Sequence, residues 1–220
     1  MERVICLAVG YVFGLFQTGY LVGKLRHIDI RQQGSGNAGT TNALRVMGWK
    51  AGAVTFLGDV LKCVLAVVLM RYIYQESAYA PLLGMYAGMG ATLGHNFPFY
   101  LKFKGGKGIA VLAGLIVSTS FWMVPIPLAV FLTAVLLTRY VSLGSLLAST
   151  TFFLEVLLFG KMGGFQMAFN YRLELYVIAF LLMGLAWIRH KENIKRLLAG
   201  TENRFGSKKE SQEKKTDRNR

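Results

Sequence analysis

The chain has few cysteines and few acidic side chains. Only Cys6 and Cys63 occur among its 220 residues, and each lies inside an apolar run, so we expect neither a disulfide framework nor a cysteine metal site. Aspartate and glutamate number 11 against 25 lysines and arginines, which leaves a formal net charge of +14. Cations beside apolar segments suit anionic lipid headgroups and anionic substrates. The alternative, for most of them, is that they only fix the membrane topology.

Three catalytic signatures are also missing. The chain has no Gly-x-x-x-x-Gly-Lys-Ser/Thr loop, which disfavours nucleotide hydrolysis. The His-x-x-x-x-Asp signature of one large acyltransferase class is absent at His27, His95 and His190. No Asp-x-x-Asp or His-x-x-x-His cluster occurs, as an oxygen- or imidazole-rich metal site would suggest, so we expect no metal and no cofactor.

Long apolar runs are abundant. Hydrophobic residues make up 54% of the chain and its mean hydropathy is +0.43, which is typical of a compact polytopic membrane protein. A transmembrane helix requires roughly 20 apolar residues. The first run lacks a basic n-region and a small-x-small cleavage site, so we expect a retained span rather than a signal peptide. The clear candidate spans are residues 4–22, 51–70, 79–100, 140–159 and 171–188.

The apolar stretch 109–138 allows two interpretations. A single helix of this length would be about 45 Å long, against a hydrocarbon core of about 30 Å. The segment 122–127, which contains Pro125 and Pro127, divides the stretch. Either one kinked helix crosses the membrane, or two short helices meet at a proline turn.

The distribution of cations among the connectors decides between them, because the number of crossings sets the side of the membrane on which each basic connector lies. If the two basic connectors are both cytoplasmic, two crossings within 109–138 also keep Arg139 and the basic C-terminal segment inside, in line with the positive-inside tendency. We therefore expect an all-α, polytopic integral membrane protein with seven transmembrane helices, its N-terminus outside and its C-terminus cytoplasmic. The cations of the two connectors are Lys24, Arg26, Arg31, Arg45 and Lys50, and Lys102, Lys104 and Lys107.

This topology places two glycine-rich loops and the start of the C-terminal segment on one membrane face, which is consistent with a single shared site. No internal repeat is evident. We expect one membrane-embedded domain over residues 1–205. Residues 206–220 are charged and lack bulky apolar side chains, so we expect a disordered cytoplasmic tail.

The first glycine-rich loop, residues 34–42, has the residue types of a phosphate cradle. Its glycines allow positive φ, so successive backbone N–H groups can point into one concavity. Residues 40–42 can cap the next helix, whose N-terminus favours an anion, and Arg45 can bind phosphate in a fork. Taken alone, the loop is explained equally well as a mobile connector with helix caps. Its candidate residues are Gly34, Ser35, Gly36, Asn37, Gly39, Thr41 and Asn42.

The second loop, residues 94–108, repeats this logic. His95 closes the preceding span and could act as a general base, although a histidine at a helix end can also be a structural hydrogen-bond partner. Three glycines with two lysines precede the next apolar helix. These residues are Lys104, Gly105, Gly106, Lys107 and Gly108.

Two other groups of polar residues lie near the expected site. Asp59 and Lys62 are three residues apart and share a helical face. Because ionisable groups in a bilayer usually face a polar interior, we expect them to form a structural pair beneath the loops. The segment 189–198 has apolar residues at helical spacing and could lie on the interface. Asn193, Lys195 and Glu202 could complete the site, and a plain juxtamembrane basic helix is the alternative.

Three motifs stand in a fixed order along the chain. The first is Gly34-Ser35-Gly36-Asn37-x-Gly39-x-Thr41-Asn42 with Arg45, and the second runs from Gly94-His95-x-x-Pro98 to Phe103-Lys104-Gly105-Gly106-Lys107-Gly108. The third is Arg189-His190-x-x-Asn193-Ile194-x-Arg196-Leu197-x-x-Gly200-x-Glu202. Together they resemble the motifs of the bacterial acyl-phosphate:glycerol-3-phosphate acyltransferases, the PlsY family. The resemblance covers residues 4 to about 205.

The resemblance implies transfer of a fatty acyl group from acyl phosphate to the 1-hydroxyl of sn-glycerol 3-phosphate, which gives lysophosphatidic acid and inorganic phosphate in phospholipid biosynthesis. It also implies a bacterial inner-membrane protein with its site at the cytoplasmic face. The expected partners are glycerol 3-phosphate, a long-chain acyl phosphate rather than acyl-CoA or acyl carrier protein, and membrane lipids. We expect no nucleic acid and no obligate protein partner.

An acyl phosphate is a mixed anhydride with a good leaving group, so positioning and charge neutralisation can suffice without a covalent nucleophile. In this hypothesis Ser35 orients a substrate, the cations hold phosphates, and Asn193 and Glu202 bind glycerol hydroxyls or order the loops. The base could be His95, Glu202 or the donor's own phosphate. The candidate catalytic residues are Ser35, Arg45, His95, Lys104, Asn193 and Glu202. The candidate binding residues are Gly34, Gly36, Asn37, Gly39, Thr41, Asn42, Gly105, Gly106, Lys107, Gly108, His190 and Lys195.

A transporter or channel for an organic phosphate is the competing class. It would show inverted repeats and broken helices near the bilayer centre. A membrane scaffold with basic loops is a third class, and it leaves the serine, asparagine and histidine positions unexplained.

Overall fold

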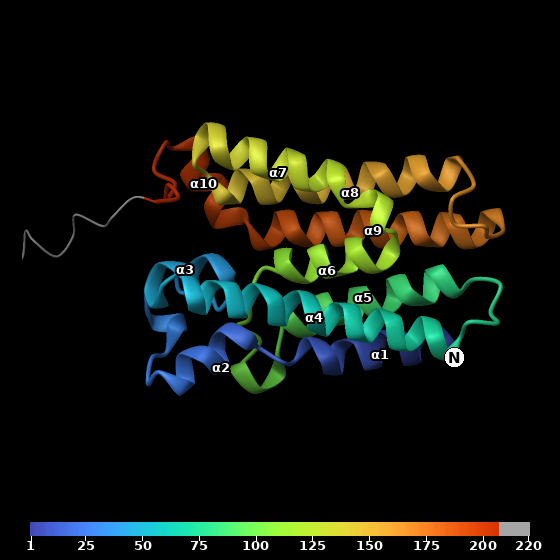
Figure 1. Ribbon diagram of the computed structural model, residues 1–220, viewed down its shortest axis with the longest axis horizontal. Helices are drawn as coiled ribbons and strands as arrows, with labels where there is room; N and C mark the ends of the chain where they lie inside the picture. The colour runs from blue at the N-terminus through green and yellow to red at the C-terminus, as the bar shows by residue number, and fades with distance from the viewer. Residues whose placement is uncertain (207–220) are drawn as a thin grey trace, which may run out of the picture.

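A computed structural model describes residues 1–206, so most of the expected tail, residues 207–220, lies outside the described part. Within residues 1–206 the chain is helical and has no strand. The long helices lie lengthwise beside one another in a bundle (Figure 1). The helices are α1 (Glu2–Gly14), α2 (Thr18–Leu25), η1 (Ile30–Gln32), α3 (Thr40–Met47), α4 (Trp49–Ile73), α5 (Ala80–Asn96), η2 (Phe99–Leu101), α6 (Ile109–Thr119), η3 (Phe121–Met123), α7 (Pro125–Thr138), α8 (Val141–Lys161), α9 (Phe169–Arg189) and α10 (Lys191–Leu198).

The bundle has two sides, which meet where α5 packs on α9 and α6 packs on α8. Helices α1, α4 and α5 form one side, α7, α8 and α9 form the other, and α6 lies between them (Figure 1). The short helices α2, α3 and α10 gather at one end, and the N-terminus lies at the opposite end. The two basic connectors and the chain after α9 therefore meet at the same end of the bundle, as the distribution of cations predicted.

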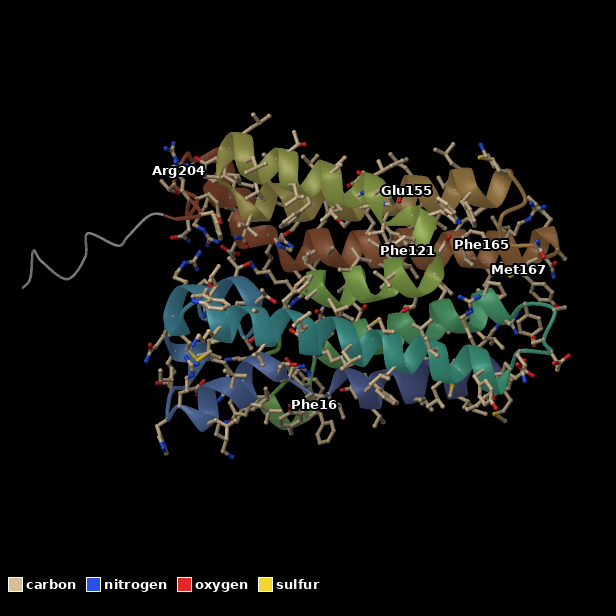
Figure 2. The ribbon with its side chains drawn as sticks, viewed as in Figure 1. Phe16, Phe121, Glu155, Phe165, Met167 and Arg204 are labelled. Atoms are coloured by element: carbon tan, nitrogen blue, oxygen red, sulfur yellow. The ribbon has the colours of Figure 1, made fainter. Side chains whose placement is uncertain are left out.

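The outside of the bundle is apolar along its length (Figure 2). Large hydrophobic side chains such as Phe121, Leu136 and Leu137 are more than two-thirds exposed. Within the described residues, five helical segments are long and apolar enough to cross a membrane: Glu2–Leu25, Trp49–Ile73, Phe121–Thr138, Val141–Lys161 and Phe169–Arg189. Helix α5 has 17 residues and α6 has 11, so both are shorter.

The expected continuous helix over residues 4–22 is interrupted. Helix α1 ends at Gly14 and α2 begins at Thr18. The amide of Gln17 is buried in the gap and donates to the carbonyl oxygens of Gly14 at 3.1 Å, Gly94 at 3.3 Å and His95 at 3.1 Å. A buried amide needs partners of this kind, so the polar residue within the apolar run marks the break and ties it to the end of α5.

The stretch 109–138 forms two helices, as the two-helix alternative predicted. Helix α6 ends at Thr119, and Ser120 is extended with φ −161° and ψ 130°. The short helix η3 follows, and Pro125 begins α7 at a position where proline's missing N–H is no loss.

Glycines let α1 and α5 approach each other closely. A Cβ at Gly10 would stand 2.0 Å from the carbonyl oxygen of Ala87, and one at Gly90 would stand 2.1 Å from that of Leu7. Small residues at such crossings allow backbone contact between membrane helices. This packing holds the end of α5, and therefore His95, against the break after α1.

Replacing Gly90 by valine should lower the thermal unfolding midpoint in detergent micelles. The added side chain would overlap the Leu7 carbonyl and force α1 and α5 apart, at a cost of about 1–3 kcal/mol for an overpacked contact. Gly184→Val on α9 is the matched control, because a Cβ there meets nothing within 4 Å. Equal shifts of the midpoint in the two variants would contradict the role given to the glycine contact.

Candidate active site

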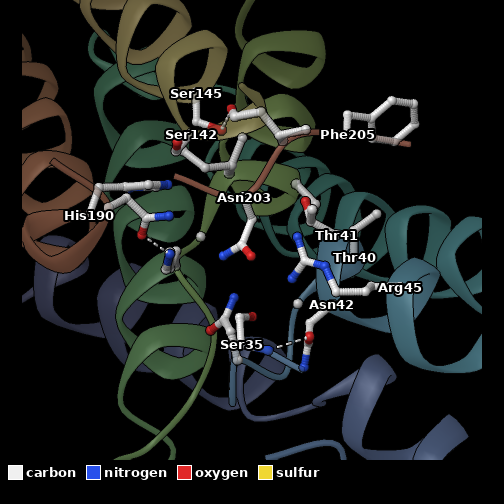
Figure 3. Close-up of a pocket in the computed structure, with 18 of the residues that line it drawn as sticks. Ser35, Thr40, Thr41, Asn42, Arg45, Ser142, Ser145, His190, Asn203 and Phe205 are labelled. Atoms are coloured by element: carbon white, nitrogen blue, oxygen red, sulfur yellow. Dashed lines mark hydrogen bonds between the residues drawn. The ribbon is translucent and has the colours of Figure 1, made fainter. Parts of the chain in front are cut away.

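A cavity of about 160 Å³ lies where both glycine-rich loops, α3 and α10 meet (Figure 3). Segments far apart in the chain contribute to its walls, and polar side chains from several of them point into it. Twelve residues singled out from the sequence line this cavity. They are Ser35, Asn37, Gly39, Thr41, Asn42, Arg45, His95, Lys107, Gly108, His190, Asn193 and Glu202.

Asn42 organises the first glycine-rich loop. Its side-chain oxygen accepts from the backbone N–H of Ser35 at 2.9 Å, and its amide donates to the carbonyl oxygens of Ile30 at 3.1 Å and Gln33 at 3.0 Å. Gly34 has φ +62°, and a Cβ there would stand 2.2 Å from the Asn42 oxygen. Asn42 is therefore the hub that folds the loop over the start of α3, and it holds Ser35 at the cavity.

The guanidinium of Arg45 faces the cavity without a carboxylate partner among the described residues. It points from α3 into the cavity (Figure 3). No carboxylate of residues 1–206 forms an ion pair with it. A guanidinium in this state can bind a phosphate in a bidentate fashion.

The second glycine-rich loop does not form the phosphate cradle that its glycines suggested, because its backbone is hydrogen-bonded to the end of α5. The N–H groups of Gly105 and Gly106 donate to the carbonyl oxygens of Asn96 at 3.2 Å and His95 at 3.1 Å. Their own carbonyl oxygens accept from the Arg189 guanidinium at 3.2 Å and 2.9 Å. These two glycines thus serve close packing on α5, and this geometry does not support the phosphate-binding role expected for their amides.

A hydrogen-bonded chain links the second loop to the C-terminal segment. The Lys107 ammonium donates to the side-chain oxygen of Asn193, whose amide donates to Glu202 at 2.9 Å. The other oxygen of Glu202 accepts from Arg196 at 2.8 Å. Both oxygens of the buried Glu202 carboxylate are therefore engaged, and this one anion orders two motifs.

Burial sets the charge states of His190 and Lys107. The Nδ1 of His190 donates to the carbonyl oxygen of Ala186 at 2.7 Å, and burial lowers the pKa of His190 to about 4, so the ring is neutral near pH 7. The pKa of Lys107 is lowered to about 8, mainly by burial; Glu202 opposes this shift and the neighbouring arginines add to it. Lys107 is therefore a cation whose charge is sensitive to mildly alkaline pH.

Six of the predicted site residues lie outside the cavity wall. Lys104 is exposed and lines a second hollow beside Tyr20 and Arg31. Lys195 is exposed and pairs with Glu192 at 3.3 Å on the outer face of α10. The structure does not bring these two cations into the cavity. The remaining four are Gly34, Gly36, Gly105 and Gly106, whose backbones support the loops.

Several lining residues were not predicted from the sequence. Ser142 and Ser145 from α8 and Asn203 from the chain after α10 face the cavity (Figure 3), and Phe205 lines its edge. The two serines are three residues apart in an otherwise apolar helix, which was an available signal for a polar helix face. Asn203 and Phe205 offered no such spacing.

The comparisons with known proteins agree over almost the whole chain. A family model described as glycerol-3-phosphate acyltransferase matches residues 4–200. The chain belongs to this family. A glycerol-3-phosphate acyltransferase of Thermoanaerobacter sp. (strain X514) is 41% identical over 211 residues, which span 96% of this chain and 99% of the relative. That of Clostridioides difficile (strain 630) is 41% identical over 209 residues, spanning 94% and 97%.

Solved structures give the same answer for the fold. The crystal structure of PlsY, an integral membrane glycerol 3-phosphate acyltransferase, in its glycerol 3-phosphate form matches with a TM-score of 0.82 at 32% identity, covering 94% of this chain and 96% of that one. The lysophosphatidic acid form matches with a TM-score of 0.79 at 31% identity. The predicted membership of the PlsY family is confirmed, and the chain is a glycerol-3-phosphate acyltransferase with an all-helical fold.

The kcat/KM of this PlsY-family acyltransferase for glycerol 3-phosphate should fall as pH rises through about 8. Lys107 is charged below its pKa of about 8 and neutral above it, while a phosphate monoester keeps its full charge above a second pKa of about 6. A pH profile of initial rates at low substrate concentration reports such a group of the free enzyme. Lys107→Arg keeps the charge and should move the falling limb to higher pH. Superimposable profiles for the two proteins would contradict this role.

Proposed function

We propose that the chain transfers a fatty acyl group from acyl phosphate to the 1-hydroxyl of sn-glycerol 3-phosphate, with lysophosphatidic acid and inorganic phosphate as products. The observation that carries this proposal is the charge of the cavity. Three cations, Arg45, Lys107 and Arg196, line it with two carboxylates, Asp59 and Glu202, and Asp59 already pairs with Lys62. A net cationic cavity suits two reactants that each carry phosphate.

The cavity lining also contains apolar residues, which suit an acyl chain. They come from α4, α6, α7 and α8. A donor with a long chain can place that chain against these residues while its phosphate lies among the cations, since burial of apolar surface is favourable. The apolar lining residues are Phe56, Ile109, Ala110, Phe131 and Val141.

The proposed chemistry is direct transfer without an acyl-enzyme. The acceptor hydroxyl attacks the carbonyl carbon of the acyl phosphate, the bond to the phosphate oxygen breaks, and phosphate leaves. Arg45 and Lys107 hold phosphate groups and offset the charge that develops on the leaving group. Ser35 orients a substrate through its hydroxyl. Gly39, Thr41 and the start of α3 add backbone donors near the same place.

Asn193 and Glu202 have positioning roles in this proposal. Asn193 bridges Lys107 and Glu202, and Glu202 also binds Arg196. Glu202 and the phosphate of the donor are the candidates for the group that takes the hydroxyl proton. His95, the third candidate from the sequence, has its Nδ1 2.8 Å from the Lys62 ammonium, so that nitrogen is not free to accept a proton.

The transporter alternative accounts less well for the same features. It requires a polar path through the bundle, whereas the described cavity is lined by the two glycine-rich loops, by α3 and α10 and by the adjoining ends of the long helices. The break between α1 and α2 is filled by Gln17, which is 1% exposed, and so does not line a channel there.

Purified protein should release phosphate from palmitoyl phosphate only when glycerol 3-phosphate is present, and palmitoyl-CoA should not replace the donor. Arg45→Gln should lower kcat/KM about tenfold to a thousandfold, because a charged contact to phosphate is lost. Lys50→Gln is the matched control, since Lys50 is exposed and lies outside the cavity wall. Phosphate release without the acceptor, or equal activity of the Arg45 and Lys50 variants, would contradict the proposal.

We also propose seven membrane crossings, with the cavity at the cytoplasmic face of a bacterial inner membrane. The seven segments are the five long spans with α5 and α6, which sit inside the bundle and pack against longer helices. The basic loops around the cavity support a cytoplasmic position for this end.

Cysteine labelling should separate the two ends of the bundle. Both native cysteines are buried, so single added cysteines can be read against a low background. Lys50→Cys and Lys102→Cys at the cavity end should react with an impermeant maleimide only after permeabilisation of spheroplasts. Glu76→Cys and Lys161→Cys at the other end should react in intact ones. Labelling of Lys50→Cys and Lys102→Cys from opposite sides of the membrane would refute the topology.

A further inference from the structure

A cluster of ionisable side chains lies beneath the cavity, between α4 and α5. Asp59, Lys62 and His95 are 1%, 4% and 3% exposed, and Asp59 and His95 reach the cavity wall. The pair that the sequence spacing predicted is present, with 2.8 Å between the Lys62 ammonium and the Asp59 carboxylate. Buried charges are costly unless they are paired and hydrogen-bonded, so the partners of each group define its protonation.

The hydrogen bonds of Lys62 fix the state of His95. Its ammonium nitrogen lies 2.7 Å from the carbonyl oxygen of Phe16, 2.8 Å from the Asp59 carboxylate and 2.8 Å from Nδ1 of His95. An ammonium has three donors and no acceptor. The carbonyl and the carboxylate can only accept, and the third donor then points at the imidazole. Nδ1 of His95 is therefore the unprotonated nitrogen, and the ring proton lies on Nε2.

We propose that Lys62 is a positioning residue that locks His95 in the Nε2–H tautomer, so that His95 presents a hydrogen-bond donor to a phosphate oxygen of the bound substrate. The inference rests on the proposed function and names one further contact within it. A doubly protonated ring is excluded by the same geometry, because it would set a second cation and a second donor 2.8 Å from the ammonium. Asp59 has the supporting role of compensating the buried charge of Lys62.

The space beside Nε2 depends on Gly106. A Cβ at this position would stand 2.0 Å from Nε2 of His95. Only glycine fits at position 106, because any side chain there would overlap the imidazole. The backbone of the second loop therefore packs directly on the ring of His95. This contact explains the glycine in terms of His95 rather than of an anion bound by its amide.

His190 has the opposite tautomer and provides an internal reference. Its Nδ1 donates to the carbonyl oxygen of Ala186 at 2.7 Å, so its Nε2 carries the lone pair. The two imidazoles that line one cavity thus differ in function: His95 donates through Nε2, and His190 accepts through Nε2.

Nitrogen NMR of the histidine rings tests the assignment without any turnover, so its result is independent of the proposed reaction. The chain has three histidines, and His→Gln variants assign their signals in protein labelled with ¹⁵N-histidine in micelles at pH 7. The expected spectrum shows His95 protonated on Nε2 only and His190 protonated on Nδ1 only. A proton on Nδ1 of His95, which is the pattern of a neutral Lys62, would overturn the proposal.

Variants test whether Lys62 is the cause. Lys62→Met should leave His95 in a mixture of tautomers, whereas Lys161→Met, at an exposed lysine, should not change its spectrum. If Lys62→Met does not fold, Asp59→Asn/Lys62→Met removes both buried charges and serves the same purpose. An unchanged pure Nε2–H spectrum without Lys62 would show that it is not the positioning residue.

Activity supplies the second readout. The side-chain amide of glutamine can donate from near the Nε2 position, and that of asparagine lies nearer to Nδ1. His95→Gln should therefore retain about tenfold more kcat/KM than His95→Asn, the factor expected for one hydrogen bond to a charged group. Greater activity of the asparagine variant would overturn the assigned donor.

Discussion

An excess of positive charge in a partly buried cavity is the constraint on which the site depends. Cations that will hold phosphate must sit close together before phosphate arrives, and they repel one another there. The buried Glu202 carboxylate meets this cost by binding Arg196 directly and Lys107 through Asn193. One such anion does not neutralise the three cations of the cavity, Arg45, Lys107 and Arg196. The pKa of Lys107 is lowered mainly by burial; Glu202 opposes this shift and the neighbouring arginines add to it. In the proposed reaction, the phosphate of a substrate supplies the missing negative charge, so the excess of cations favours its binding.

The sequence predicted the parts of the site that depend on local pattern. Lys107 stands between two glycines and Arg45 follows the first glycine-rich loop, both in connectors between apolar runs. The distribution of cations alone predicted that both connectors lie at one end of the bundle, where the structure has them. The sequence could not assign a role to Gly105 and Gly106, because glycine is equally suited to exposing a backbone amide and to close packing. Only the tertiary contact with α5 shows which applies. Lys104 and Lys107 are three residues apart in one loop, yet they line different hollows, which the sequence does not show.

The break between α1 and α2 was the main departure from the expected fold, and it has a chemical use. In a continuous helix the carbonyl oxygen of Phe16 would accept from the N–H four residues later. The interruption frees that oxygen, and Lys62 donates to it at 2.7 Å. Gln17, the next residue, binds the carbonyl oxygens of Gly94 and His95. In the sequence, Gln17 is a single polar residue in an apolar run. In the structure it binds the backbone of His95, and the break beside it frees the carbonyl oxygen that binds Lys62, the partner of the His95 ring.

In the proposed reaction, one cavity brings together reactants of opposite solubility. Its lining contains apolar side chains, among them Phe56 and Phe131, as well as the cations Arg45 and Lys107. A donor with its chain against the apolar side chains and its phosphate among the cations has its carbonyl carbon between the two groups. A small, water-soluble acceptor held by its own phosphate then needs to bring only a hydroxyl to that place. Fixing both reactants in this way can supply a large part of the barrier reduction through orientation alone. On this proposal an activated donor needs no covalent nucleophile. The most important residues are then the cations of the cavity and the two residues that position them, Asn193 and Glu202.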